Sequence, residues 1–324
     1  MNRRELLIAA AAAPVALALP RAASAAARGG LPLALVTADS IDRVLAVRLT
    51  DLEIVRSLPV PDQPHGIEAV DLLRAALVLS QASGTVTVLN AAAPRVRTVL
   101  EGFHGPRYAA GDPRGTYAYV SDDVAGQVVA IDVPRARVIG RVEVGEGARH
   151  ITISPDGRRV ITSLGSKAPR LALVDVSQPR RPRLVRTFPA DDLAHDVGFT
   201  PDGKHVWISS GVDRRLAIHD ALSLRPLRAV PGDAAPQHVT FDSWAGLIYV
   251  ASGDSGTLRT HRMADGALLR MRRVTTGSYN VCALTGRVVT PSLDDGRLTL
   301  LDAKGLRSAH VAAHAHDACI VVAA

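Results

Sequence analysis

Seven two-residue steps, about 42 residues apart, carry the side chains best suited to bind a ligand. Each step has a polar member, and five of the seven contain histidine although the whole chain has only 11 histidines. The steps are Pro64-His65, Arg107-Tyr108, Arg149-His150, His195-Asp196, Gln237-His238, Tyr279-Asn280 and His316-Asp317. Neutral imidazoles and carboxylates suit a transition-metal ion, and arginine can hold a carboxylate or phosphate through two hydrogen bonds.

Residues from these steps form the predicted ligand-binding set, which we expect at one mouth of a central channel. The set is His65, Arg107, Tyr108, Arg149, His150, His195, Asp196, His238, Asn280, His316 and Asp317. Four histidines within it are the candidate metal ligands: His150, His195, His238 and His316. A mouth that carries His, Arg and Tyr also suits an acidic macrocycle, so the cofactors to consider are a transition metal and a tetrapyrrole.

The same steps also have a purely structural interpretation. Buried polar groups need hydrogen-bond partners. A His or Asp at the start of a repeat can bond backbone amides where the linking segment turns inward. The sequence leaves both interpretations open, because they use the same residue types at the same positions.

The steps recur because the chain is built from an internal repeat, which decides the fold. The clearest unit, HITISPDG at residues 150–157, precedes a Val-rich strand and recurs as DVGFTPDG at residues 196–203. The residues that open the units are His65, Tyr108, His150, Asp196, His238, Asn280 and Asp317, with gaps of 43, 42, 46, 42, 42 and 37. Proline fixes φ and glycine accepts a positive φ, so Pro-Asp-Gly predicts a tight turn between two strands.

One unit predicts four short strands, in its clearest copy at residues 150–154, 158–164, 170–176 and 183–188. Four strands per repeat of about 40 residues are typical of a propeller blade. The C-terminal stretch, residues 317–322, predicts the first strand of a unit, while residues 33–58 predict three strands without a first. We therefore predict an all-β, seven-bladed β-propeller over residues 31–324, with four antiparallel strands per blade and a 1+3 closure of C-terminal and N-terminal strands.

The repeat resembles the YVTN-type seven-bladed propeller family. The resemblance rests on the pattern His/Asp–apolar–x–apolar–Ser/Thr-Pro-Asp-Gly before a Val-rich strand, with Tyr119-Val120-Ser121-Asp122 and Tyr249-Val250-Ala251-Ser252 as the nearest copies of the name-giving strand. It covers residues 31–324, although several repeats lack Pro-Asp-Gly. The resemblance implies the fold and little about function, because bacterial relatives include exported propellers of unsettled role, lactonase-type propellers and haem-binding propellers.

The first 25 residues predict a cleaved signal peptide. Arg3-Arg4 precede an apolar run from Leu6 to Leu19, and Ala23-Ser24-Ala25 offers a cleavage site. The string Asn2-Arg3-Arg4-Glu5-Leu6-Leu7 resembles a twin-arginine signal, with an ordinary secretion signal as the alternative. We expect a short linker at residues 26–30, a periplasmic or secreted location and no transmembrane segment in the mature chain.

The charge distribution argues against one class of partner, and the two cysteines raise the question of a disulfide. The formal net charge is +7, spread as arginine pairs on predicted turns, so we expect no specific nucleic-acid partner. Cys282 and Cys319 occupy equivalent inner positions of neighbouring blades, which are usually further apart than a disulfide spans. We therefore favour two buried thiols, with a disulfide formed after export as the alternative. We expect a monomer.

No standard catalytic motif occurs: the chain lacks H-E-x-x-H, G-x-S-x-G, a Walker loop and G-x-G-x-x-G. The leading hypothesis is therefore a non-catalytic propeller that binds a small-molecule ligand or protein partner at the channel mouth. The alternatives are a lactonase-like or lyase-like enzyme with a histidine as base or metal ligand, and a metal- or tetrapyrrole-binding protein, all using the same residues.

Overall fold

The fold is almost entirely β in this computed structural model, which describes residues 30–70 and 74–323. The described part has 27 strands and one 3-10 turn, η2 (Asp39–Ile41). None of its helical segments is long and apolar enough to cross a membrane. The predicted signal peptide, residues 1–25, lies outside the described residues, as does all of the linker except its last residue.

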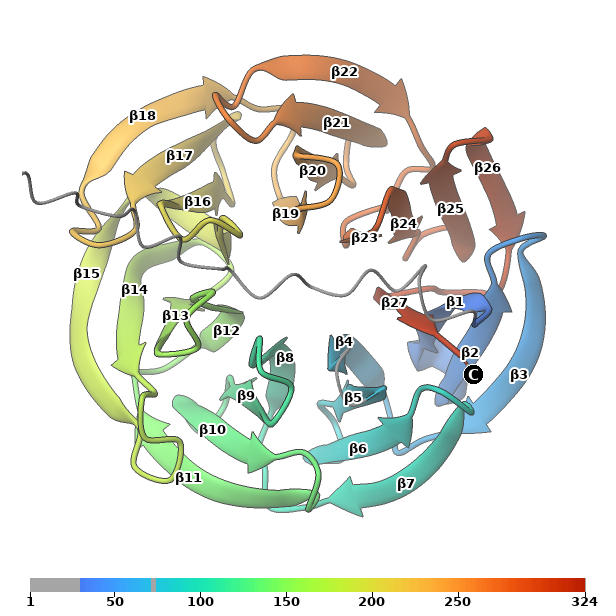
Figure 1. Cartoon of the computed structure of the whole chain (residues 1–324), viewed down its shortest axis with the longest axis horizontal. Coiled ribbons are helices and arrows are strands. Elements are labelled where there is room, and N and C mark those ends of the chain that lie inside the picture. Colours follow the sequence, from blue (N-terminus) through green and yellow to red (C-terminus); the bar gives the residue numbers. More distant parts are fainter. Residues whose placement is uncertain (1–29, 71–73, 324) are drawn as a thin grey trace, which may run out of the picture.

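The strands form six antiparallel sheets arranged around a common axis (Figure 1). Five sheets have four strands each. They comprise β27 (Ala318–Val322), β1 (Pro32–Ala38), β2 (Arg43–Arg48) and β3 (Glu53–Pro59); β4 (Pro64–Val70), β5 (Ala75–Ser80), β6 (Thr85–Asn90) and β7 (Arg95–Leu100); β8 (Pro106–Gly111), β9 (Tyr117–Asp122), β10 (Gln127–Asp132) and β11 (Arg137–Glu143); β19 (Gln237–Asp242), β20 (Leu247–Ser252), β21 (Thr257–Arg262) and β22 (Leu268–Arg273); and β23 (Cys282–Leu284), β24 (Arg287–Pro291), β25 (Arg297–Asp302) and β26 (Gly305–His310).

The sixth sheet has seven strands, where the repeat pattern predicts two separate blades. It comprises β12 (Ala148–Ile153), β13 (Arg159–Leu164), β14 (Ala168–Asp175), β15 (Arg183–Phe199), β16 (His205–Ser210), β17 (Arg215–Asp220) and β18 (Pro226–Pro231). β15 is 17 residues long and runs without a break from its pairing with β14 to its pairing with β16. The predicted strand end at residue 188 is therefore wrong, because the connecting backbone stays extended.

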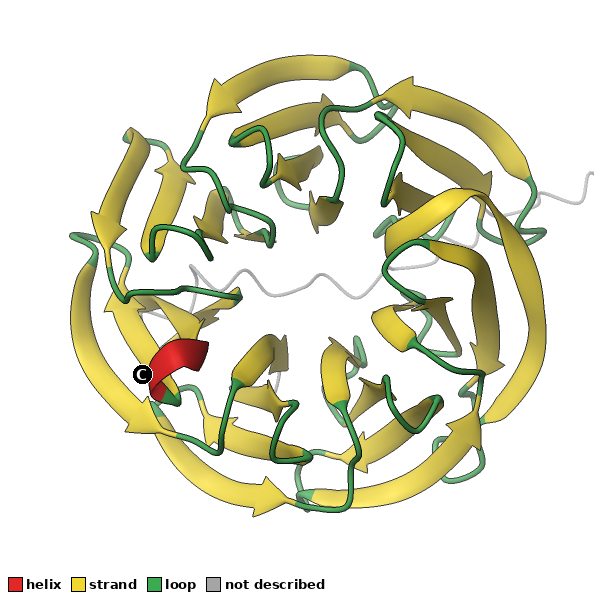
Figure 2. Ribbon diagram, turned by 180° about the vertical axis from the view of Figure 1, so that it is seen from behind, coloured by secondary structure: helices red, strands yellow, loops and turns green. Residues whose placement is uncertain are grey.

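The last strand of the described chain pairs with the first. β27 runs antiparallel to β1, with Cys319 opposite Leu35 and Ile320 opposite Ala34. Figure 2 shows the same arrangement from behind, with the sheets placed around the axis and loops connecting consecutive strands. Segments nearly 300 residues apart thus share one sheet, as the unmatched strands at the two ends of the sequence predict.

The core lies between neighbouring sheets. All six residues of β5 are buried, whereas β3 and β7, at the outer edge of their sheets, are mostly exposed. Leu77 and Val88 of one sheet pack with Val120 and Val129 of the next in a single apolar cluster. Small aliphatic side chains fill these interfaces, as the low aromatic content requires, and their removal from water stabilises the ring.

The predicted turns are present where Pro-Asp-Gly occurs. Gly157 and Gly203 have φ of +68° and +70°. Residues with a Cβ atom adopt this backbone conformation only with steric strain, so glycine is favoured there. Asp156 accepts a hydrogen bond from the amide of Arg158, and Asp202 accepts one from that of Lys204. These short links hold the two innermost strands of each unit in register.

Candidate functional site

The innermost strands enclose a central cavity of about 190 Å³. Its lining comes from strands β4, β8, β12, β15, β19, β23 and β27 or from the residues just before them. Members of the predicted set that line it are Tyr108, His150, Asp196, His238, Asn280 and Asp317. The repeat therefore brings residues far apart in sequence to one channel, and we call the ring formed by the predicted set the mouth.

Four of these strands carry a β-bulge at the mouth. The pairing register shifts between Pro64 and Gly66, Pro106 and Tyr108, Ala148 and Ile151, and Ala194 and Val197. A bulge adds a residue and breaks the alternation of side chains between the two faces of a strand. His195 and Asp196 are adjacent in sequence, yet both approach the ring of His238. The bulges explain why both members of a predicted step reach the mouth.

The bulge in β4 also changes which residue opens the first unit. Gly66 pairs with Leu79 as Tyr108 pairs with Ser121, so Gly66 rather than His65 opens that unit. His65 instead occupies the bulge, at the position of Arg107. It still lies at the mouth, with its ring centroid 5.6 Å from that of Tyr108.

Three of the four candidate metal ligands come together. His150, His195 and His238 are all buried, and one ring nitrogen from each lies within 4.8 Å of the others. Nε2 of His195 is 3.0 Å from Nε2 of His238. In tetrahedral zinc sites the ligand nitrogens are about 3.3 Å apart, so His195 and His238 are near that spacing and His150 would have to move toward them to share an ion. We call these residues the three-histidine cluster.

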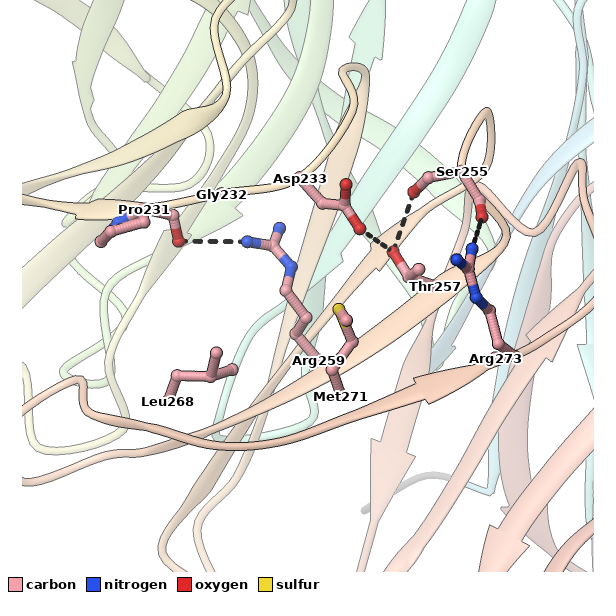
Figure 3. A pocket seen from close by; sticks show the side chains of 9 residues that line it. All are labelled: Pro231, Gly232, Asp233, Ser255, Thr257, Arg259, Leu268, Met271 and Arg273. Atoms are coloured by element: carbon pink, nitrogen blue, oxygen red, sulfur yellow. Dashed lines mark hydrogen bonds between the residues drawn. The ribbon is translucent and has the colours of Figure 1, made fainter.

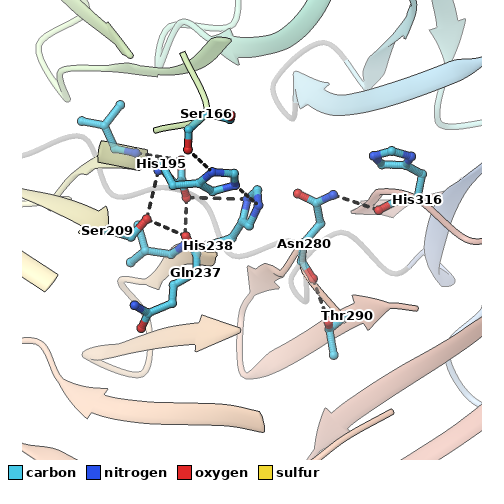
Figure 4. Close-up of polar contacts among 11 residues, drawn as sticks. Ser166, His195, Ser209, Gln237, His238, Asn280, Thr290 and His316 are labelled. Atoms are coloured by element: carbon cyan, nitrogen blue, oxygen red, sulfur yellow. Dashed lines mark hydrogen bonds and ion pairs between the residues drawn. The ribbon is translucent and has the colours of Figure 1, made fainter. Parts of the chain in front are cut away.

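The tautomer of His195 is set by its second nitrogen. Nδ1 of His195 lies 2.8 Å from the carbonyl oxygen of Ser166, to which it donates (Figure 4). Nε2 of a neutral His195 then carries a lone pair that points at His238. An outer carbonyl that orients a ring in this way is typical of metal-binding histidines.

His150 has an unusual environment for a buried polar side chain. It is 2% exposed, and neither of its ring nitrogens has a hydrogen-bond partner. Its ring stacks on Tyr108, with centroids 4.1 Å apart. Buried nitrogens without partners are costly, and a bound ligand would remove that cost.

Burial keeps the cluster neutral. It lowers the pKa of His150 and His238 well below the usual histidine range, and that of His195 to about 4. The nearby charge of Arg149 lowers each of these pKa values further. Neutral imidazole is the form that coordinates a metal, so the cluster needs no deprotonation at neutral pH.

His316 does not join the cluster. Its Nδ1 lies 3.1 Å from Oδ2 of Asp39, and its ring centroid is 3.7 Å from that of His65. Figure 4 shows His316 across the opening from His195 and His238. The hydrogen bond from His316 lowers the pKa of Asp39. Asp39 was not predicted as a partner of His316, because it lies on the η2 turn, outside the repeat pattern.

The acidic and amide members of the set have structural roles. Asp196 accepts hydrogen bonds from the amides of Val197 and Val239, and Asp317 accepts them from Ala318 and Ile67. Each carboxylate thereby links two neighbouring innermost strands, as the structural interpretation expects. Desolvation in the channel raises the pKa of Asp196 to about 7 and that of Asp317 to about 6.

Asn280 likewise bonds the backbone, since its Nδ2 donates to the carbonyl oxygen of His316 at 2.8 Å. Cys282 and Cys319 are both thiols that line the central cavity. Cys319 is buried as predicted, whereas Cys282 is only half-buried. The mouth thus combines a structural ring of hydrogen bonds with one cluster of histidines.

The arginine pair, Arg107 and Arg149, faces a single carboxylate. Their Nη1 atoms lie 3.8 and 3.7 Å from Oδ2 of Asp123, and Nη1 of Arg107 also donates to Gln81 at 2.6 Å. Asp123 and Gln81 were not predicted, because they follow the second strands of their units, β9 and β5, and lie outside the repeated polar steps that precede the first strands.

A second cavity of about 310 Å³ lies away from the mouth, on the sheet formed by β19–β22 (Figure 3). Its buried cation, Arg259, donates to the carbonyl oxygen of Pro231 and to the side chain of Gln237. Asp233 accepts from Thr257 at 2.6 Å. The polar groups of this cavity mainly satisfy one another, which favours a structural role.

The fold resembles those of solved proteins at low sequence identity. A functionally unknown protein from Desulfotomaculum acetoxidans DSM 771 aligns with a TM-score of 0.78 and 14% identity, over 90% of this chain and 99% of the other. Kuenenia stuttgartiensis hydrazine synthase aligns with a TM-score of 0.63 and 19% identity, over 74% of this chain and 76% of the other. No family model and no curated protein sequence matches the chain. The similarities show a β-propeller-like all-β fold and say nothing of activity.

Proposed function

We propose that this protein binds a divalent transition-metal ion at the three-histidine cluster and presents it to a small ligand in the channel mouth. The observation that carries the proposal is the convergence of three buried imidazoles within 4.8 Å. Imidazole suits zinc, copper, nickel and iron, and three protein ligands leave a coordination position for water or a ligand.

The other cofactor considered, a tetrapyrrole, fits less well. The central cavity holds about 190 Å³, below the roughly 300 Å³ at which pockets for cofactors begin. A single ion needs only the space between the three rings. The size of the cavity therefore favours a metal over a macrocycle.

We further propose that the ring consists of seven blades of the YVTN type with a 1+3 closure. Support comes from β15, whose residues 183–194 pair with β14 and whose residues 194–199 pair with β16. Counted once as an outer and once as an inner strand, β15 divides the seven-stranded sheet into two four-stranded blades. The sheet β27-β1-β2-β3 would then be the composite blade. An exported, periplasmic or secreted protein would meet its metal and ligand outside the cytoplasm.

A hydrolytic activity is the second candidate. Three histidines with an open position form the ligand pattern of catalytic zinc sites, which lower the pKa of bound water to about 7. A small ester or lactone would be the substrate class. Zinc-dependent turnover that disappears without the three histidines would favour this candidate over simple binding.

The direct test is a calorimetric titration of the metal-free protein with zinc. We expect one ion per chain with submicromolar affinity, since the three ligands are already neutral and assembled. Release of fewer than one proton per ion at pH 7 is also expected, because the histidines carry no protons to displace. Absence of zinc, copper and nickel binding under these conditions would remove the proposal.

A further inference from the structure

The arginine pair at the mouth carries more positive charge than its neighbours balance. Arg107 and Arg149 share the one carboxylate of Asp123, and no other carboxylate lies within 4.0 Å of either guanidinium in the described part of the chain. The contacts of 3.8 and 3.7 Å to Asp123 are too long for direct hydrogen bonds. The pair therefore keeps a net charge of about +1 in a partly buried place.

Both guanidinium groups also keep unused donors. The Nε atoms of Arg107 and Arg149 are buried and have no hydrogen-bond partner. The two side chains are only 16% and 19% exposed, so solvent reaches them poorly. Buried charged donors without acceptors are costly, and an oxyanion would satisfy them.

The arginine pair lies beside the three-histidine cluster. Arg149 directly precedes His150 in the same bulge, and Arg107 occupies the equivalent bulge of the neighbouring strand. Arg107 also directly precedes Tyr108, whose ring stacks on His150 with centroids 4.1 Å apart, so both arginines adjoin residues that belong to or contact the cluster. A metal ion between the histidines would add positive charge to the same opening.

We infer that the ligand of the mouth is a small molecule with a carboxylate or phosphate group, which Arg107 and Arg149 hold beside the three-histidine cluster. This inference rests on the proposed metal site and names the class of its ligand. The two parallel N–H groups of each guanidinium match two oxygens of such a group. The negative charge of the oxyanion would neutralise the positive charge that Asp123 alone does not balance.

The test uses malonate and inorganic phosphate as probes on the full chain. Both are titrated calorimetrically into metal-free protein, and malonate also into zinc-loaded protein. We expect binding of at least one probe, tighter with zinc for malonate, and the preferred probe distinguishes a carboxylate from a phosphate ligand. Arg149→Gln should weaken binding at least about tenfold, and the Arg107→Gln, Arg149→Gln double variant should abolish it.

Matched variants separate the possible results. Arg270→Gln removes an exposed arginine on the outer strand β22 and should leave anion binding unchanged. Arg149→Lys keeps the charge without the fork and should bind between wild type and Arg149→Gln, which keeps the test valid if the glutamine variants unfold. The arginine variants should still bind one zinc.

The inference is overturned if neither anion binds while zinc does, or if the double variant binds malonate and phosphate as the wild type does. Anion binding that needs the arginines in a protein that takes no zinc would support the inference and contradict the metal site instead. The two proposals can therefore fail separately.

Discussion

Replacing His150 with alanine is expected to weaken zinc binding at least about 100-fold. His150 supplies one of only three ligands, and both of its nitrogens are buried without a partner. Its loss leaves His195 and His238, and two imidazoles do not form a closed site. Competition with a chromophoric chelator measures the change. The same variant should fold, because the ring makes no hydrogen bond and its removal costs only its packing against Tyr108.

His316→Ala is the matched control. The sequence makes His316 a fourth candidate ligand, but the structure pairs it with Asp39 on the far side of the mouth. We expect its zinc affinity to stay within about threefold of the wild type. Equal losses in the two variants would contradict the assignment of three ligands, as would an unchanged affinity in His150→Ala.

The metal-free protein is expected to lose stability as the pH falls from 7 to 5. Burial lowers the pKa of His65, His150, His195 and His238 below the value of about 6.5 that each has when unfolded. Below pH 6.5 the unfolded chain therefore binds protons that the folded chain does not, so the free energy of unfolding decreases. For His195, with a pKa of about 4, the loss between pH 7 and 5 is about 2 kcal/mol.

Two carboxyl groups act in the opposite direction. The raised pKa values of Asp196 and Asp317, about 7 and about 6, let the folded chain take up protons before the unfolded chain does. This adds stability as the pH falls, but four imidazoles outweigh two carboxyls. Urea unfolding at pH 5 and 7 measures the net effect. His195→Gln should flatten the dependence and Asp196→Asn should steepen it; a wild-type stability that rises toward pH 5 would contradict this account.

Much of the fold follows from local sequence. The three strands predicted within residues 33–58 are β1, β2 and β3, because short apolar runs separated by turn residues act locally. Pro-Asp-Gly forms its turns for the same reason. The pairing of β27 with β1 was also predictable, since a unit with one missing strand and a lone strand complete each other.

The site was harder to predict because its details depend on contacts between distant segments. The continuity of β15 reflects how two sheets pack, not a local signal at residues 189–194. The bulge that displaces His65 changes the register by one residue, which repeat spacing alone does not detect. The pairing of His316 with Asp39 joins residues from opposite ends of the chain, so no spacing rule could separate His316 from the other three histidines.

X-ray absorption spectroscopy of the zinc-loaded protein tests the central claim most directly. The account predicts three imidazole nitrogens at about 2.0–2.1 Å, with the outer-ring scattering of histidine and one further light atom. Sulfur at about 2.3 Å would instead assign the ion to Cys282 and Cys319, and a shell of oxygens alone would assign it to surface carboxylates. Either spectrum would contradict a metal site at His150, His195 and His238.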